Sequence, residues 1–204
     1  MLTLTAIMLS LSMQAVPVPQ MRRRVTEPPR ATGTCAALPL DLAATVPIVE
    51  VRIGERPYRF LIDTGAQGHG RIKRALAEQL GLAVVGQART PAPGGTVEER
   101  PVYALPALAL GGIAFQDLEL TAAPVIPGRE LPFDGILGLD AFRNFTLTLD
   151  YGNRRLHVSD RPLAAGVALV PDQPLATFPV EIDGRSFPAH LDTGNQAASL
   201  FLNE

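Results

Sequence analysis

The sequence predicts an all-β fold that contains one short helix. Two observations support this prediction. The 204 residues include 19 prolines and 18 glycines, which divide the chain into short segments joined by turns. Within several of those segments apolar and polar residues alternate with a period of two, which is typical of half-buried strands. Helical spacing occurs in only one short segment.

The first strands are expected between Val46 and Asp63. In VPIVEVRIGERPYRFLID the apolar residues alternate on both sides of a turn that begins at Gly54, so a β-hairpin delivers Asp63 at the end of its second strand. The following stretch RIKRALAEQLGL, residues 71–82, has apolar residues at helical spacing. Gly81 lies where a C-terminal cap belongs. We therefore expect the single helix directly after Asp63.

The middle of the chain returns to strand patterning. Gly94 and Gly95 are placed at the tip of one hairpin, and Gly111 begins the turn of the next. The stretch LPFDGILGLDAF, residues 131–142, runs from an apolar strand into a helical turn, and two strands around Gly152 follow. Together these elements predict one β-rich lobe over residues 38–160.

The N-terminal residues are expected to lie outside this lobe. Residues 1–15, MLTLTAIMLSLSMQA, are apolar and uncharged and resemble a signal peptide, although three arginines that follow at 22–24 oppose export. Export to the periplasm or the medium is the favoured interpretation, and a disordered tail of a cytoplasmic protein is the alternative. Residues 16–37 are rich in proline and are expected to form a linker.

Composition argues against several classes of function. The formal net charge is −2 and charged residues make up 19% of the chain, so no nucleic-acid partner is expected. The single cysteine, Cys35, has no partner for an intrachain disulfide and is interpreted as a small apolar residue. The three histidines lack the paired spacing of a metal site. We expect no metal and no cofactor.

The hairpin that ends in Asp63 occurs a second time near the C-terminus. FLIDTG matches AHLDTG when Asp63 is set against Asp192, an offset of 192 − 63 = 129 residues. The same offset pairs apolar positions along both strands: Val51 with Val180, Ile53 with Ile182, Tyr58 with Phe187, and Ile62 with Leu191. This pattern indicates an internal repeat. Residues 161–204 are accordingly interpreted as the start of a second, incomplete lobe.

A repeated Asp-Thr-Gly suggests that two carboxyl groups act together. Two carboxyl groups held close together cannot both ionise, so one donates its proton while the other takes a proton from water. Gly65 and Gly194 would leave room behind Asp63 and Asp192. Thr64 and Thr193 could hydrogen-bond to the opposite loop; this geometry needs two copies of one loop.

These motifs resemble those of the retropepsin-like aspartic proteases, and the second Asp-Thr-Gly resembles the second lobe of pepsin-like enzymes. The resemblance covers residues 44–160 and implies a barrel lobe, a polypeptide substrate and catalytic roles for Asp63 and Asp192. It implies that Thr64, Gly65, Ala66, Thr193 and Gly194 support the two catalytic loops. It further implies that the hairpin around Gly94 and Gly95 is a flap over the substrate, and that Ile136–Gly138 crosses behind the first loop.

The sequence leaves alternatives open. After Asn195 no helix, flap or second apolar-apolar-Gly segment follows, so we expect either a fragment of a longer two-lobed protein, which we favour, or a homodimer that pairs Asp63 with Asp63. An aspartic endopeptidase is the leading function, and a non-catalytic binding or dimerisation module is the alternative. Ala66 carries no hydroxyl that could donate to the carboxylate of Asp63. A less acidic pH optimum than that of pepsin-like enzymes is therefore expected.

Overall fold

The computed structural model describes residues 27–42, 44–91, 97–125, 128, 130–163, 165, 166, 169 and 175–195. The expected signal peptide and the expected flap tip at Gly94 and Gly95 lie outside these residues. Within them, no helix is long and apolar enough to cross a membrane.

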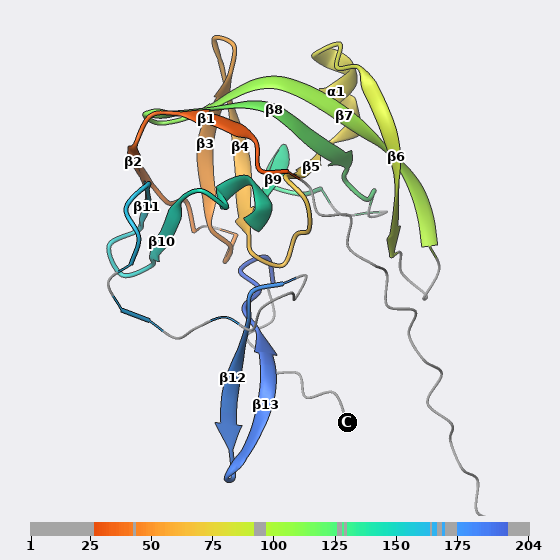
Figure 1. Ribbon diagram of the computed structural model, residues 1–204. Helices are drawn as coiled ribbons and strands as arrows, with labels where there is room; N and C mark the ends of the chain where they lie inside the picture. Colours follow the sequence, from red (N-terminus) through yellow and green to blue (C-terminus); the bar gives the residue numbers. More distant parts are fainter. Residues whose placement is uncertain are drawn as a thin grey trace, which may run out of the picture.

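The lobe is built around a closed, mixed barrel of six strands (Figure 1). The strands follow the order β8, β5, β9, β4, β3, β7, and β7 pairs again with β8 to close the ring. Strand β1 extends the sheet beside β8, and β6 extends it beside β7. The strands of this sheet are β1 Arg30–Thr32, β3 Ile48–Ile53, β4 Arg56–Asp63, β5 Gly70–Ile72, β6 Val84–Pro91, β7 Val97–Leu110, β8 Ile113–Ala122 and β9 Gly135–Gly138.

Shorter elements complete the lobe. Helix α1, Arg74–Gln79, follows β5, and the 3-10 turn η1, Leu139–Phe142, follows β9. A separate three-stranded sheet has the order β10, β11, β2. Its strands are β2 Cys35–Pro39, β10 Thr146–Asp150 and β11 Arg155–Ser159. The expected all-β fold with one short helix is confirmed.

Strand alternation separates an inner and an outer face of the barrel. Phe60 and Ile62 of β4 point inward and are fully buried in the main core with Leu137 of β9 and Leu120 of β8. Leu61 points the other way, into a smaller group of buried apolar residues that we call the outer cluster. Its other members are Val46, Ile48, Ala66, Phe133 and Ile136. Asp63 lies two residues after Leu61 and therefore on the outer face.

Two boundaries differ from those expected. Strands β1 and β2 lie largely within residues 16–37, the expected linker, so the lobe begins near Arg30 instead of residue 38. Neither strand shows long alternation; each is short and is held by a distant partner, β8 for β1 and β11 for β2. The helix is also shorter than residues 71–82, because Ile72 belongs to β5 and is fully buried there. Gly81 follows the helix with φ +64°, as its role in a cap requires.

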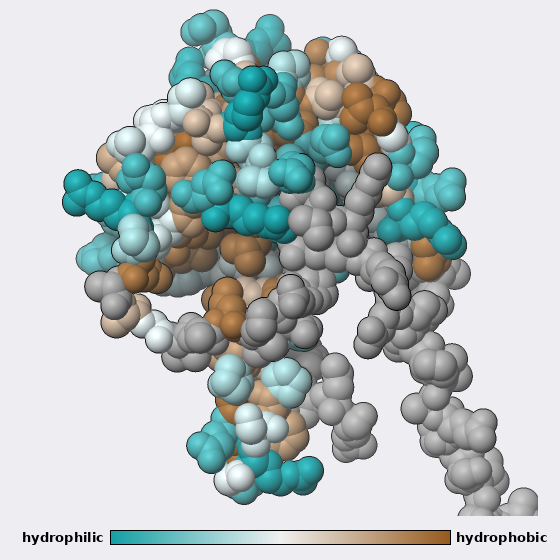
Figure 2. All heavy atoms as spheres, in the orientation of Figure 1, coloured by the Kyte–Doolittle hydropathy of each residue, from teal (hydrophilic) through white to brown (hydrophobic). Residues whose placement is uncertain are grey.

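The C-terminal hairpin projects from the lobe (Figures 1 and 2). It consists of β12, Thr177–Ile182, and β13, Arg185–His190. Each of its six residue pairs equals a pair of β3 and β4 shifted by 129; for example, Val180 faces Phe187 as Val51 faces Tyr58. Burial differs between the two hairpins. Val51 is fully buried, whereas Val180 is only partly buried and Leu191 is 52% exposed.

Candidate active site

Asp63 lies where β4 ends and a tight loop begins. Strand β9 runs parallel to β4 and pairs Gly138 with Asp63, so it supports this end of β4 from behind. A Cβ at Gly138 would lie 2.7 Å from the carbonyl oxygen of Gly68 and 2.8 Å from that of Ala66. Glycine at this position therefore lets the loop fold back against β9.

Asp192 lies in the corresponding loop after β13, and the two loops interlock through their threonines. Thr64 Oγ1 donates to the carbonyl oxygen of Leu191 at 2.6 Å and accepts from the N–H of Thr193 at 3.1 Å. Thr193 Oγ1 makes the same pair of bonds in reverse, donating to the carbonyl oxygen of Ile62 at 2.8 Å and accepting from the N–H of Thr64 at 3.1 Å. These four bonds fix the loops against each other with twofold symmetry.

Each glycine of the two motifs faces the carboxyl group of the other loop. A Cβ at Gly65 would lie 2.5 Å from Cγ of Asp192, and a Cβ at Gly194 would lie 2.6 Å from Cγ of Asp63. The N–H of Gly65 donates to Oδ1 of Asp63 at 2.8 Å, and that of Gly194 donates to Oδ1 of Asp192 at 2.9 Å. Only glycine fits at these positions, and its absent side chain lets the carboxyl groups approach each other.

The electrostatic environment raises the pKa of Asp63 above its ordinary value of 3.8. Burial is the main cause, because the charged form loses water, and the neighbouring carboxylate of Asp192 adds repulsion. The N–H of Gly65 and the cationic Arg71 oppose the rise by stabilising the charged form. The net result favours a proton on Asp63.

Two further side chains hold the Asp63 loop in place. Asp140 of η1 is buried and accepts from the N–H of Gly68 at 3.2 Å and from Arg143 at 2.9 Å. His69 is also buried; the N–H of Glu119 donates to its Nδ1 at 2.9 Å, so its Nε2 carries the proton that bonds the carbonyl oxygen of Glu27 at 2.7 Å. Sequence reasoning missed both roles. The only local signal was that Asp140 closely follows the Ile136–Gly138 segment.

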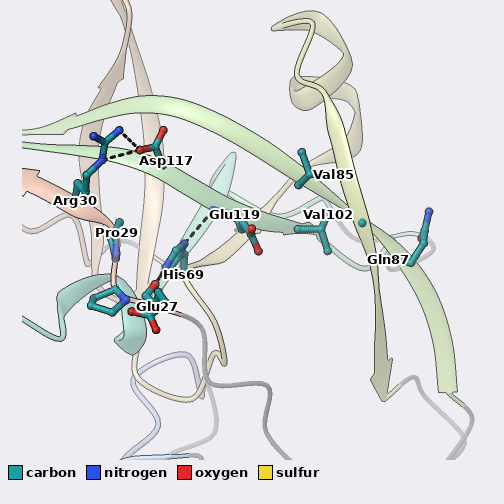
Figure 3. Close-up of a pocket in the computed structure, with 11 residues that line it drawn as sticks. Glu27, Pro29, Arg30, His69, Val85, Gln87, Val102, Asp117 and Glu119 are labelled. Atoms are coloured by element: carbon teal, nitrogen blue, oxygen red, sulfur yellow. Dashed lines mark hydrogen bonds and ion pairs between the residues drawn. The ribbon is translucent and has the colours of Figure 1, made fainter.

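A cavity of about 430 Å³ opens beside this loop (Figure 3). His69 and Glu119 form one side, and Val85 and Val102 of the β6–β7 hairpin form another. Residues 27–30 and Asp117 complete the lining together with Gly86 and Gln87. Asp63 is not part of this lining. Asp192 is not part of it either, so this cavity does not contain the two carboxyl groups.

Of the remaining expected site residues, the structure describes Ala66 but not Gly94 and Gly95. Ala66 is buried in the outer cluster, and its N–H bonds back to the carbonyl oxygen of Asp63 at 3.2 Å. Gly94 and Gly95 lie outside the described residues. In the described residues, no group of three histidine, cysteine, aspartate or glutamate side chains could hold a metal ion.

Part of the chain matches a known protein family. Residues 49–141, which span β3 to η1 and include the Asp63 loop, match the aspartyl protease family. A search of curated proteins found no match.

Among solved structures, the chain is similar to the crystal structure of a retropepsin-like aspartic protease from Rickettsia conorii. The sequence identity is 15% and the TM-score is 0.45, with 63% of this chain and 92% of that chain covered. Asp192 and the β12–β13 hairpin lie outside the stretch that matches the family.

Proposed function

We propose that this chain is an aspartic-type endopeptidase in which Asp63 and Asp192 jointly activate a water molecule. The observation that carries the proposal is the reciprocal set of threonine bonds, which sets the two Asp-Thr-Gly loops face to face. An ordinary pair of turns has no need of such symmetry. A reaction that divides acid and base work between two carboxyl groups does need it.

The environment of Asp63 suggests how the two roles are divided. Because the pKa of Asp63 is raised, we assign the shared proton of the free enzyme to Asp63. The carboxylate of Asp192 then takes a proton from water while the water oxygen attacks the peptide carbonyl carbon. Asp63 gives its proton to the carbonyl oxygen, and a tetrahedral diol forms.

Collapse of this diol returns both carboxyl groups to their starting states. Asp192 passes the proton that it received to the departing nitrogen, and the C–N bond breaks. Asp63 recovers a proton from one hydroxyl of the diol as the new carboxyl group forms. Atoms and protons balance, because one water is consumed and one amine and one carboxylic acid are produced.

Both carboxyl groups of the proposed dyad come from one chain. Thr64 and Thr193 of the same molecule form the four bonds between the loops, so pairing of Asp63 with Asp63 of a second copy is not required. The polypeptide substrate would lie across the outer face of the barrel, beneath the β6–β7 hairpin. We also propose export of the protein, for which the apolar residues 1–15 are the support.

Cleavage of an unfolded protein tests this function. The chain is incubated with a reduced and alkylated protein across mildly acidic pH, and new N-termini are identified by mass spectrometry. We expect cleavage by the wild type, loss of cleavage in Asp63→Asn and in Asp192→Asn, and full cleavage in Asp160→Asn, which changes an exposed carboxyl group elsewhere. Binding of the unfolded protein without cleavage by the wild type would instead favour a non-catalytic module.

A further inference from the structure

Arg71 places a positive charge on the same face of the barrel as Asp63. Paired residues form one row across this outer face. Leu61 of β4 faces Ile136 of β9, which in turn faces Arg71 of β5. On its other side Arg71 faces Thr121 of β8, and Thr121 faces Val102 of β7. Leu61 and Ile136 belong to the outer cluster, which confirms the direction of the row. Asp63 lies two residues beyond Leu61 on the same strand. Arg71 is therefore one pleat away from the Asp63 row.

The guanidinium of Arg71 is partly buried but has no fixed partner. Within the described residues it makes no hydrogen bond and no ion pair. The nearby Arg100 differs, because Glu98 holds it through bonds of 3.2 Å from Nε and 2.8 Å from a terminal nitrogen. A guanidinium carries five N–H donors. In Arg71 these donors remain available.

The charges around Arg71 show what it faces. Burial is the main cause that lowers the pKa of Arg71, and attraction to Asp63 opposes it. Arg100 repels it, and Asp192 attracts it more weakly. Arg71 thus lies within electrostatic reach of both carboxyl groups of the proposed dyad, next to a second cation. A buried cation in such a place favours an additional anion.

A bound peptide would make the lack of a partner costly. When a substrate covers this face it removes the water that now serves the donors of Arg71, and a desolvated charge without a partner is strongly unfavourable. The substrate must therefore supply an acceptor. A carboxylate is the best one, because it accepts two parallel N–H bonds from a guanidinium.

We propose that Arg71 determines specificity by binding an aspartate or glutamate side chain of the substrate close to the scissile bond. The location of this subsite beside a scissile bond rests on the proposed peptidase function. The binding preference itself can be measured without catalysis. Arg71 is a recognition residue in this account and takes no part in proton transfer.

Binding of matched peptide libraries tests the preference. Fluorescein-labelled octapeptide libraries carry either Glu or Gln at one position at a time, and their affinity for the full chain with Asp63→Asn is read by fluorescence anisotropy. At one or two adjacent positions we expect Glu to bind about 10- to 100-fold more tightly than Gln, the range given by charged hydrogen bonds. Equal affinity for Glu and Gln at every position would overturn the proposal.

Variants identify the residue responsible. Arg71→Met should reduce the preference to within about twofold while leaving the Gln libraries bound, and Arg71→Lys should keep part of it because the charge remains. Arg56→Met, which changes an exposed arginine at the β3–β4 turn, should keep it fully. A preference that survives Arg71→Met overturns the proposal. If Arg71→Met does not fold, the intermediate preference of Arg71→Lys decides instead, and an unchanged preference there contradicts bidentate binding.

Cleavage by the wild type separates this proposal from the proposed function. A Glu preference in binding without any cleavage would leave the Arg71 subsite standing and refute the peptidase. Cleavage with equal kcat/KM for Glu and Gln peptides would leave the peptidase standing and refute the subsite.

Discussion

Replacing Thr64 with valine should release the loop of Asp192 from the barrel. Valine has nearly the shape of threonine but lacks the hydroxyl, so the loss at this buried side chain falls mainly on its hydrogen bonds. Two hydrogen bonds are lost: the one from Thr64 Oγ1 to the carbonyl oxygen of Leu191, and the one from the N–H of Thr193 to Thr64 Oγ1. Each such loss costs about 1 to 1.5 kcal/mol, so the docked state should weaken by about 2 to 3 kcal/mol.

Hydrogen exchange at the amide of Thr193 measures this loss directly, because that N–H donates to the deleted hydroxyl. The expected loss of protection is about 30- to 150-fold, at roughly tenfold per 1.4 kcal/mol. Thr64→Ser keeps the hydroxyl and should retain most of the protection. If Thr64→Val left the exchange rate of Thr193 within about twofold of the wild type, the interlocking of the two loops would be refuted.

Three further predictions concern stability and pH. Thr90→Val should leave the free energy of unfolding unchanged or raise it by up to about 1 kcal/mol in urea titrations, because the buried Thr90 hydroxyl has no partner among the described residues; a clear loss would contradict this. Gly70→Ala should lower the free energy of unfolding by more than about 3 kcal/mol or prevent folding, because its Cβ would lie 1.9 Å from the carbonyl oxygen of Ile136. Gly54→Ala, whose Cβ would have nothing within 4 Å, should lower it by only about 1 to 2 kcal/mol. Peptide cleavage should be fastest above about pH 3, because Ala66 donates no hydroxyl to Asp63; a maximum below that pH, where the lower pKa of a pepsin-type dyad (about 1.5) lies, would count against this.

Asp63 should also make stability depend on pH, with a sign that follows from its raised pKa. The folded state binds this proton more tightly than the unfolded state, so the stability contributed by the protonated carboxyl group is complete below its ordinary pKa of 3.8. It is lost as pH rises through the raised pKa of the folded state. Asp63→Asn stays neutral and should therefore be more stable than the wild type at neutral pH, with the difference vanishing in acid. Urea unfolding of both proteins across this pH range measures the effect, and a difference that grows in acid would contradict it.

Local signals made part of the fold predictable. Strand alternation and a glycine turn specify the β3–β4 hairpin almost without reference to the rest of the chain, and they deliver Asp63 to its end. The same signals at an offset of 129 residues placed Asp192 in an equivalent loop. Both features depend on residues that are close together in the sequence, which is where pattern reasoning is strongest.

Long-range pairing made the rest unpredictable. Strands β1 and β2 contain three and five residues and exist because β8 and β11 offer free edges, which no local pattern reveals. The roles of His69, Arg71 and Asp140 likewise arise from partners that are distant along the chain. These partners are Glu119 of β8, Ile136 of β9 and Gly68, respectively. The spacing of apolar residues in the sequence predicts that Arg71 belongs to the helix. Its pairing with Ile136 in the barrel is what directs it to the face of Asp63.

Complementation between two inactive variants tests the central claim that Asp63 and Asp192 of one chain act together. Initial rates of peptide cleavage are measured for the wild type, for Asp63→Asn, for Asp192→Asn, and for an equal mixture of the two variants. We predict cleavage by the wild type and background rates in both variants and in their mixture, because each chain would contain only one of its two carboxyl groups. Cleavage by Asp192→Asn alone, or recovery of activity in the mixture, would contradict a dyad formed within one chain.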